Sequence, residues 1–118
     1  MSRFNQTILG QIIESLVYQS LVVYSEMNEA KLYTFRNRNG SHEIDFIIQK
    51  GMTLILFEVK ADNEAKDSYV KHLNWFEATV ANDLGDVNVV KVLVNTGPFA
   101  YTRTQDNVHV IPIGMLGC

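Results

Sequence analysis

The first part of the chain carries apolar residues at helical spacing. Between residues 6 and 26 these residues recur three or four positions apart, and the intervening Gln and Glu residues favour a helix. The apolar positions are Leu9, Ile12, Ile13, Leu16, Val17 and Val23. The pattern predicts a long and largely buried first helix.

The next part of the chain has the pattern of an antiparallel sheet. Apolar and polar residues alternate, aromatic and β-branched residues are frequent, and turn sequences interrupt the runs. The predicted strands are residues 31–36, 41–49 and 52–60. Asn37-Arg38-Asn39-Gly40 joins the first two strands, and Lys50-Gly51 joins the last two in a hairpin.

The second half of the chain predicts one more helix and two more strands. Asp62-Asn63-Glu64 can cap and charge the start of the helix, which ends near residues 82–85. Its apolar residues, at helical spacing, are Tyr69, Leu73, Phe76 and Val80. Residues 87–94 are nearly continuous in Val and Leu, which is typical of a strand buried on both faces, and residues 108–113 form a final strand. The order α-β-β-β-α-β-β predicts an α/β domain with a mixed central sheet flanked by helices.

Composition is that of one folded soluble domain covering residues 1–118. Hydrophobic residues make up 47% of the chain and charged residues 19%. The net charge of −3 offers no general attraction for nucleic acid. The lone cysteine, Cys118, excludes an internal disulfide, and no leader sequence or apolar run of membrane-spanning length is evident. We therefore expect a cytoplasmic protein with no membrane contact.

Hairpin geometry brings two acidic residues together. If Lys50-Gly51 are the two loop residues, Gln49 pairs with Met52 and Asp45 lies opposite Leu56. Glu58 is then diagonal to Asp45 on the same strand face, roughly 7–8 Å away. Lys60 projects to that face as well, because side chains alternate along a strand.

Two carboxylates so placed can hold a hard divalent cation such as Mg²⁺ or Mn²⁺. Such a cation binds a phosphate and lowers the pKa of an attacking water, while Lys60 could orient that water or steady developing charge. Asp45, Glu58 and Lys60 are thus candidates for phosphodiester hydrolysis. An exposed cross-strand ion pair is the structural alternative for the Glu-x-Lys part of this set.

The residues resemble a known family. Ile44-Asp45 and Glu58-Val59-Lys60 are similar to the motif of PD-(D/E)XK nucleases, which include archaeal Holliday-junction resolvases. With Gly10 to Val17 and Phe35-Arg36 added, the chain resembles the nuclease-like domain at the carboxyl end of many prokaryotic AAA-type ATPases. The resemblance implies a restriction-endonuclease-like core, a branched or other DNA substrate, and Glu14 as a further site residue.

The chain departs from that family at three points. Ile44 replaces the motif proline, the second helix lacks a clear Gln-Tyr signature, and no phosphate-binding loop of an ATPase is present. The chain is therefore either a stand-alone relative or a piece from the carboxyl end of a larger ATPase. The alternative to a nuclease is a non-catalytic module that binds nucleic acid or a protein and regulates an associated ATPase. A third possibility is a homodimer, which the resemblance implies because such nucleases often pair to cut two strands.

Several other residues have both a functional and a structural interpretation. Arg36 could contact phosphate or be an ordinary ion-paired arginine, and Glu43 could be an outer ligand or a solvated strand end. Glu14 could instead be a polar interruption of the helix, where Gly10 favours close packing. His42, His72 and His109 are scattered in sequence without the spacing of a zinc site. Trp75, Phe76 and Tyr69 are expected to be core residues.

Overall fold

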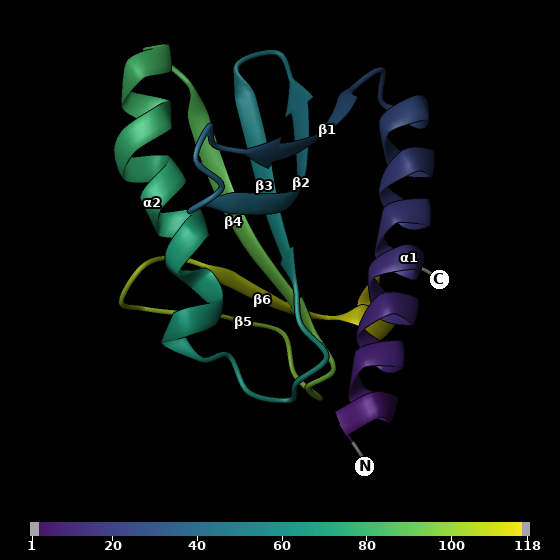
Figure 1. The fold of residues 1–118 in the computed structure, drawn as a ribbon. Coiled ribbons are helices and arrows are strands. Elements are labelled where there is room, and N and C mark those ends of the chain that lie inside the picture. Colours follow the sequence, from purple (N-terminus) through teal and green to yellow (C-terminus); the bar gives the residue numbers. More distant parts are fainter. Residues whose placement is uncertain (1–2, 117–118) are drawn as a thin grey trace.

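The chain folds into a six-stranded mixed sheet with one long helix on each face (Figure 1). The computed structural model describes residues 3–116, with side chains from residue 7 onward. Its elements are α1 (Arg3–Met27), β1 (Lys31–Arg36), β2 (Glu43–Lys50), β3 (Thr53–Val59), α2 (Asp67–Leu84), β4 (Asn88–Asn95), β5 (Tyr101–Thr102), β6 (His109–Pro112) and the 3₁₀ turn η1 (Ile113–Met115). The predicted α/β class and element order are confirmed, and the two-residue strand β5 is an addition.

The sheet order is β1-β2-β3-β4-β6-β5. Strands β1, β2 and β3 pair antiparallel, whereas β4 is parallel to both β3 and β6. The amino end of β2 and the carboxyl ends of β3, β4 and β6 therefore lie at one end of the sheet. In open α/β sheets, ligands bind at the carboxyl ends of the parallel strands.

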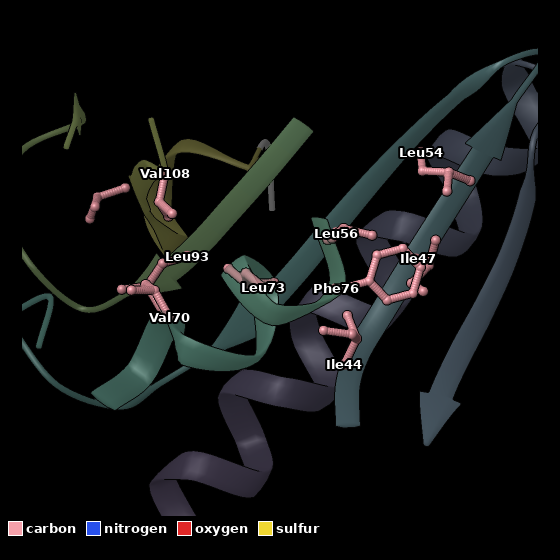
Figure 2. Close-up of a cluster of buried hydrophobic side chains, with 10 residues drawn as sticks. Ile44, Ile47, Leu54, Leu56, Val70, Leu73, Phe76, Leu93 and Val108 are labelled. Atoms are coloured by element: carbon pink, nitrogen blue, oxygen red, sulfur yellow. The ribbon is translucent and has the colours of Figure 1, made fainter. Parts of the chain in front are cut away.

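Each helix packs on its own hydrophobic cluster. Helix α2 buries Val70, Leu73 and Phe76 against one face of the sheet (Figure 2). Trp75 and Tyr69 pack against the same cluster, so the core assignment of these aromatic residues is confirmed. Helix α1 covers the other face and buries three residues spaced by four: Ile13, Val17 and Leu21.

Helix α2 begins later than the sequence predicts. Asp62, Asn63 and Glu64 precede the first helical residue, Asp67. Asp62 instead accepts hydrogen bonds from the Glu64 amide at 2.9 Å and from the Tyr69 hydroxyl at 2.5 Å. The acid that was expected to cap the helix fixes the loop before it, because a short polar side chain satisfies backbone groups as readily in a turn as at a helix start.

Helix α1 is less buried than predicted. Of the six apolar positions in the predicted pattern, Ile13 and Val17 are buried and Leu9 is half-buried. The other three, Ile12, Leu16 and Val23, are 52%, 40% and 54% exposed. By length and composition alone, residues Thr7–Met27 could also cross a membrane. The prediction that no apolar run reaches membrane-spanning length is therefore wrong. The prediction of a largely buried helix holds only for the inner face of α1.

Candidate functional site

The hairpin that carries the acids has a different register from the predicted one. Lys50 pairs with Thr53 and Phe46 pairs with Phe57, so the turn residues are Gly51 and Met52. Gly51 has φ of +58°, a conformation that glycine adopts without strain. The pairing of β3 with β2 is therefore shifted by two residues from the predicted pairing. Continuing the register places Asp45 directly opposite Glu58, closer than the diagonal position that the sequence suggested.

Strand β2 has a bulge at Asp45 and Phe46, beside the acid pair. Tyr33 of β1 pairs with Ile47, but Phe35 pairs with Ile44, so two residues of β2, Asp45 and Phe46, stand against Thr34 alone. The bulge changes which side chains share a face: Ile44 joins Ile47 in the α2 cluster, whereas Phe46 and Ile48 join the α1 cluster. Regular alternation along residues 41–49 would place Ile44, Phe46 and Ile48 on one face, and the bulge separates Ile44 from the other two. Bulges commonly re-aim side chains beside functional sites.

Asp45 and Glu58 form a largely buried acid pair. Glu58 is 4% exposed, and its Oε1 atom has no hydrogen-bond partner. Asp45 is half-buried, and its Oδ2 atom accepts a hydrogen bond of 2.8 Å from the Val59 amide. A buried carboxylate oxygen without a donor is costly unless a proton or a cation satisfies it.

The acid pair titrates abnormally. Burial raises the pKa of Glu58 to about 8, with repulsion from Asp45 as the second cause and attraction by Lys60 opposing it. Burial also raises the pKa of Asp45, although the Val59 amide partly offsets the effect. At neutral pH and without a cation, Glu58 therefore holds a proton. Two adjacent carboxyls cannot both ionise cheaply.

Lys60 lies just beyond the end of β3, close to the acids and to α2. Its amide donates a hydrogen bond of 2.9 Å to the Val94 carbonyl oxygen, which holds the residue against β4. Its Nζ atom lies 5.5 Å from the centre of the Tyr69 ring, within the range of a cation–π contact. Its charge lowers the pKa of both Asp45 and Glu58. The lysine is thus electrostatically coupled to the acid pair.

Glu14 reaches the site from α1. It lines a hollow of about 350 Å³ with Tyr18 and Phe46, and a second of about 270 Å³ that Asp45 also lines. Partial burial raises the pKa of Glu14, and the charge of Asp45 adds to the effect. In the described part of the chain, however, no three His, Cys, Asp or Glu side chains are close enough to hold a metal ion together. Glu14 is within electrostatic reach of Asp45 but outside a preformed metal cage.

Arg36 and Glu43 lie at the outer edge of the same end of the sheet. The Arg36 Nη2 atom is 3.1 Å from Glu43 Oε2, and the two side chains are 71% and 55% exposed. Glu43 is therefore a solvated, ion-paired strand end, and Arg36 is an exposed surface arginine. Both residues line the hollow that Asp45 and Glu14 share.

Two histidines that are distant in sequence meet beside α2. His42 Nδ1 lies 3.0 Å from His72 Nδ1, and the His42 ring stacks on Trp75 with centres 4.0 Å apart. Burial lowers the pKa of His72, with the charge of His42 as the second cause. His109 lies apart, 2.8 Å from the Thr102 hydroxyl. No spacing in the sequence predicts the pair, because it depends on how the loop before β2 meets α2.

Two loops close the site end of the sheet by direct contact. Thr96 donates a hydrogen bond of 2.8 Å from its hydroxyl to Asn63 Oδ1 and another of 3.1 Å from its amide to the Asp62 carbonyl oxygen. Gly97 follows, and a Cβ atom there would lie 2.9 Å from the Asn63 carbonyl oxygen. Only glycine therefore allows the two loops to approach this closely.

Replacing Gly97 with alanine is expected to lower the free energy of unfolding by about 1–3 kcal/mol, because the backbone of the opposite loop must move. Gly10→Ala is the matched control. A Cβ at Gly10 meets nothing within 4 Å, which corrects the expectation of close packing there, so alanine in the helix should stabilise by roughly 0.5–1 kcal/mol. Urea unfolding of both variants measures the two effects. If Gly97→Ala and Gly10→Ala changed the free energy of unfolding equally and in the same direction, the close contact between Gly97 and the Asn63 loop would be contradicted.

The fold and this site define a mixed α/β domain with a buried acid pair and a lysine at the carboxyl end of its parallel strands. The chain belongs to the family described as a domain of unknown function, DUF4143, whose model matches residues 9–116. A comparison with curated proteins gives no match.

Proposed function

We propose that the chain is a Mg²⁺-dependent nuclease-like domain of the PD-(D/E)XK type, with Asp45 and Glu58 as metal ligands. The observation that carries the proposal is the buried Glu58 Oε1 atom, which has no donor and lies in an acid pair with raised pKa values. A divalent cation would satisfy that oxygen and remove the repulsion between the two carboxyls. Mg²⁺ is commonly held by one or two carboxylates with water and substrate phosphate completing its shell, so two protein ligands fit.

The residues of this chain have separate roles in the proposal. Asp45 is oriented by the Val59 amide, which donates a hydrogen bond to its Oδ2 atom beside Glu58. When bound, the cation supplies charge neutralisation for a phosphodiester and an acidified water. Lys60 would orient that water or steady the charge that develops on the phosphate. Glu14 would support the cluster from the facing helix, and exposed Arg36 could contact a neighbouring phosphate.

Metal binding is expected to release about one proton per cation at pH 7, because Glu58 must lose its proton to bind. Affinity should therefore rise with pH up to about 8. Titration calorimetry with Mg²⁺ or Mn²⁺, in buffers of different ionisation enthalpy, counts the protons. Asp45→Asn and Glu58→Gln should abolish binding, whereas Glu43→Gln, at the exposed neighbouring acid, should preserve it.

The same variants test catalysis. Cleavage of branched, single-stranded and duplex DNA in the presence of Mg²⁺ or Mn²⁺ should fall by at least about 10²-fold in Asp45→Asn, Glu58→Gln and Lys60→Ala. Activity that survives in both acid variants would refute the site.

A second candidate function is a non-catalytic regulatory module that retains the nuclease fold. It is favoured by the acids that line the hollow beside the site, Glu14, Glu43 and Asp45, and by the net charge of −3. Without a bound cation such a surface repels nucleic acid and suits a protein partner, including an associated ATPase. Absence of calorimetric heat at millimolar Mg²⁺, with the fold intact, would favour this module over the nuclease.

A further inference from the structure

Helix α1 is apolar on two of its sides. Its inner side is buried on the sheet, as described above. Its outer side carries what we call the outer stripe: Ile8, Ile12, Leu16, Gln19, Val23 and Met27. The five apolar members are between 39% and 79% exposed. A contiguous exposed apolar stripe commonly marks an interaction site, so this stripe is expected to have a partner.

The outer stripe has a symmetric spacing. Its members follow one another at intervals of four, four, three, four and four residues, so the spacing is the same in both directions. At about 100° per residue they fall within an arc of about 100°. Pairing of two identical helices about a two-fold axis places residue i of one copy against residue j of the other, and j against i. A stripe that is the same in both directions satisfies this condition when the helices run antiparallel.

We propose that the outer stripe docks on the outer stripe of a second copy of this chain, with the two α1 helices antiparallel. Ile8 then faces Met27 of the second copy, Ile12 faces Val23, and Leu16 faces Gln19. The numbers in each facing pair add to 35, so the axis passes between Val17 and Tyr18. The polar Gln19 lies near the axis, where a single polar residue fixes the register of paired helices.

Charge favours this partner over an acidic or basic one. None of the six members of the outer stripe is charged, and within residues 7–27 the only charged residues are Glu14 and Glu26. Glu14 lies on the flank that faces β1, where it lines the hollows beside the acid pair. Glu26 lies at the edge of the stripe, and in the antiparallel register it is opposite Leu9, because these two numbers add to 35. Self-association therefore brings no like charges together along the stripe. A charged partner would find no complementary group there.

The size of the stripe predicts a weak dimer. From Ile8 to Met27 the helix rises about 28 Å, and a strip about 10 Å wide has an area on the order of 300 Å². Standard stable interfaces bury roughly 800 Å² on each partner. The dimer is therefore expected to form and dissociate with concentration.

Sedimentation velocity between about 10 μM and about 500 μM tests the proposal, because transient interfaces dissociate across such a range. The wild-type chain should shift from monomer toward dimer, whereas Leu16→Arg should stay monomeric throughout. Met52→Arg, at a 60% exposed methionine in the β2–β3 turn, is the control and should dimerise like the wild type. Circular dichroism establishes that each variant is folded. A wild-type chain that stays monomeric at the highest concentration would overturn the proposal.

Cysteine cross-linking tests the antiparallel register in a Cys118→Ser background. The double variant Ile12→Cys with Val23→Cys should form disulfide-linked dimers on mild oxidation, because these positions face each other. Ile12→Cys alone should not, since it faces Val23. Efficient cross-linking of Ile12→Cys alone would indicate parallel helices and overturn the arrangement. Binding of monomeric chain to phosphatidylcholine vesicles, without self-association, would assign the stripe to a membrane and likewise overturn it.

Discussion

Replacing Glu58 with glutamine is expected to raise the free energy of unfolding at pH 9 by about 3–5 kcal/mol. The pKa of Glu58 is about 8 in the folded chain, against an ordinary value of 4.5. Each unit of difference corresponds to about 1.4 kcal/mol between the two protonation states. Glutamine has the same shape, carries no charge and can donate a hydrogen bond toward Asp45, so the cost of ionising this buried group disappears.

The sign of the pH dependence follows from proton binding. Below pH 4.5 Glu58 is protonated in both the folded and the unfolded chain, so it does not make the free energy of unfolding depend on pH. Between pH 4.5 and about 8 the unfolded chain has lost the proton and the folded chain retains it, so the contribution of Glu58 to stability falls as pH rises. Above about 8 both states are ionised and the loss is complete.

Urea unfolding at pH 5, 7 and 9 measures this effect. The difference between Glu58→Gln and wild type should be small at pH 5 and grow toward pH 9. Glu43→Gln, at an exposed acid paired with Arg36, should leave the pH dependence of wild type unchanged. Parallel pH profiles for Glu58→Gln and wild type would show that Glu58 titrates normally. Because Glu58→Gln should be the more stable protein, its loss of metal binding could not be attributed to unfolding.

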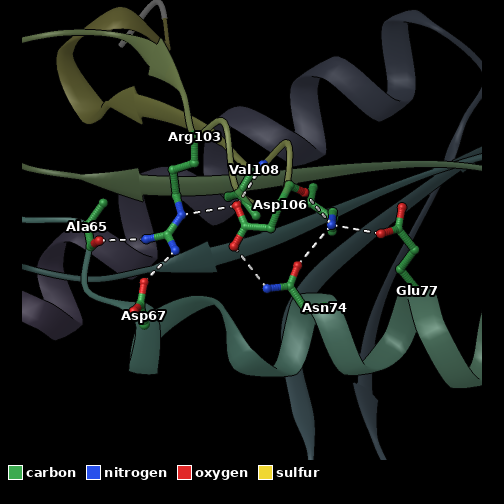
Figure 3. Close-up of polar contacts among 8 residues, drawn as sticks. Ala65, Asp67, Asn74, Glu77, Arg103, Asp106 and Val108 are labelled. Atoms are coloured by element: carbon green, nitrogen blue, oxygen red, sulfur yellow. Dashed lines mark hydrogen bonds and ion pairs between the residues drawn. The ribbon is translucent and has the colours of Figure 1, made fainter.

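Replacing Arg103 with methionine is expected to lower the free energy of unfolding by about 3–5 kcal/mol, the usual cost of removing one partner of a buried ion pair. Arg103 is 6% exposed and donates three hydrogen bonds, to the Ala65 carbonyl oxygen at 2.7 Å, to Asp67 Oδ1 at 2.6 Å and to Asp106 Oδ1 at 3.1 Å (Figure 3). Asp106 is 14% exposed and would keep its charge with one cation removed.

The network extends beyond Arg103. Asn74 donates a hydrogen bond of 3.0 Å to Asp106 Oδ2, and its own Oδ1 accepts one of 2.9 Å from Lys91. Lys91 is 5% exposed and also donates to Glu77 at 2.8 Å and to the Asp106 carbonyl oxygen at 2.6 Å. Figure 3 shows how these contacts tie α2 to the loop between β5 and β6. Loss of Arg103 leaves the contacts of Asn74 and Lys91 in place, but it removes the donors to the Ala65 carbonyl oxygen and to Asp106 Oδ1.

Arg36→Met is the matched control, since it removes the same side chain from an exposed ion pair. Its effect should be below about 0.5 kcal/mol, as for most surface salt bridges. Urea unfolding of the two variants under one condition gives the comparison. Similar losses for both variants would mean that Arg103 is solvated in solution and that the buried network does not stabilise the fold.

The candidate site could be predicted from the sequence despite an error in register. The two turn residues of the hairpin are Gly51 and Met52, one position later than the sequence suggested. Because side chains alternate along a strand with a period of two, a shift of two residues in pairing keeps Asp45 and Glu58 on a common face. The shift only brought them closer. The sequence does not predict the bulge in β2, because the bulge depends on how β1 lies against β2.

The sequence by itself determined the element order, the helix periodicities and the acid pair, because these depend on local spacing and on a short hairpin. Tertiary structure alone decided three things. It set the burial that raises the pKa of Glu58, the meeting of His42 with His72, and the exposure of the outer side of α1. Apolar residues at helical spacing favour a buried face, but a helix with two apolar sides does not specify which side meets its own sheet. Contacts between distant segments make that choice.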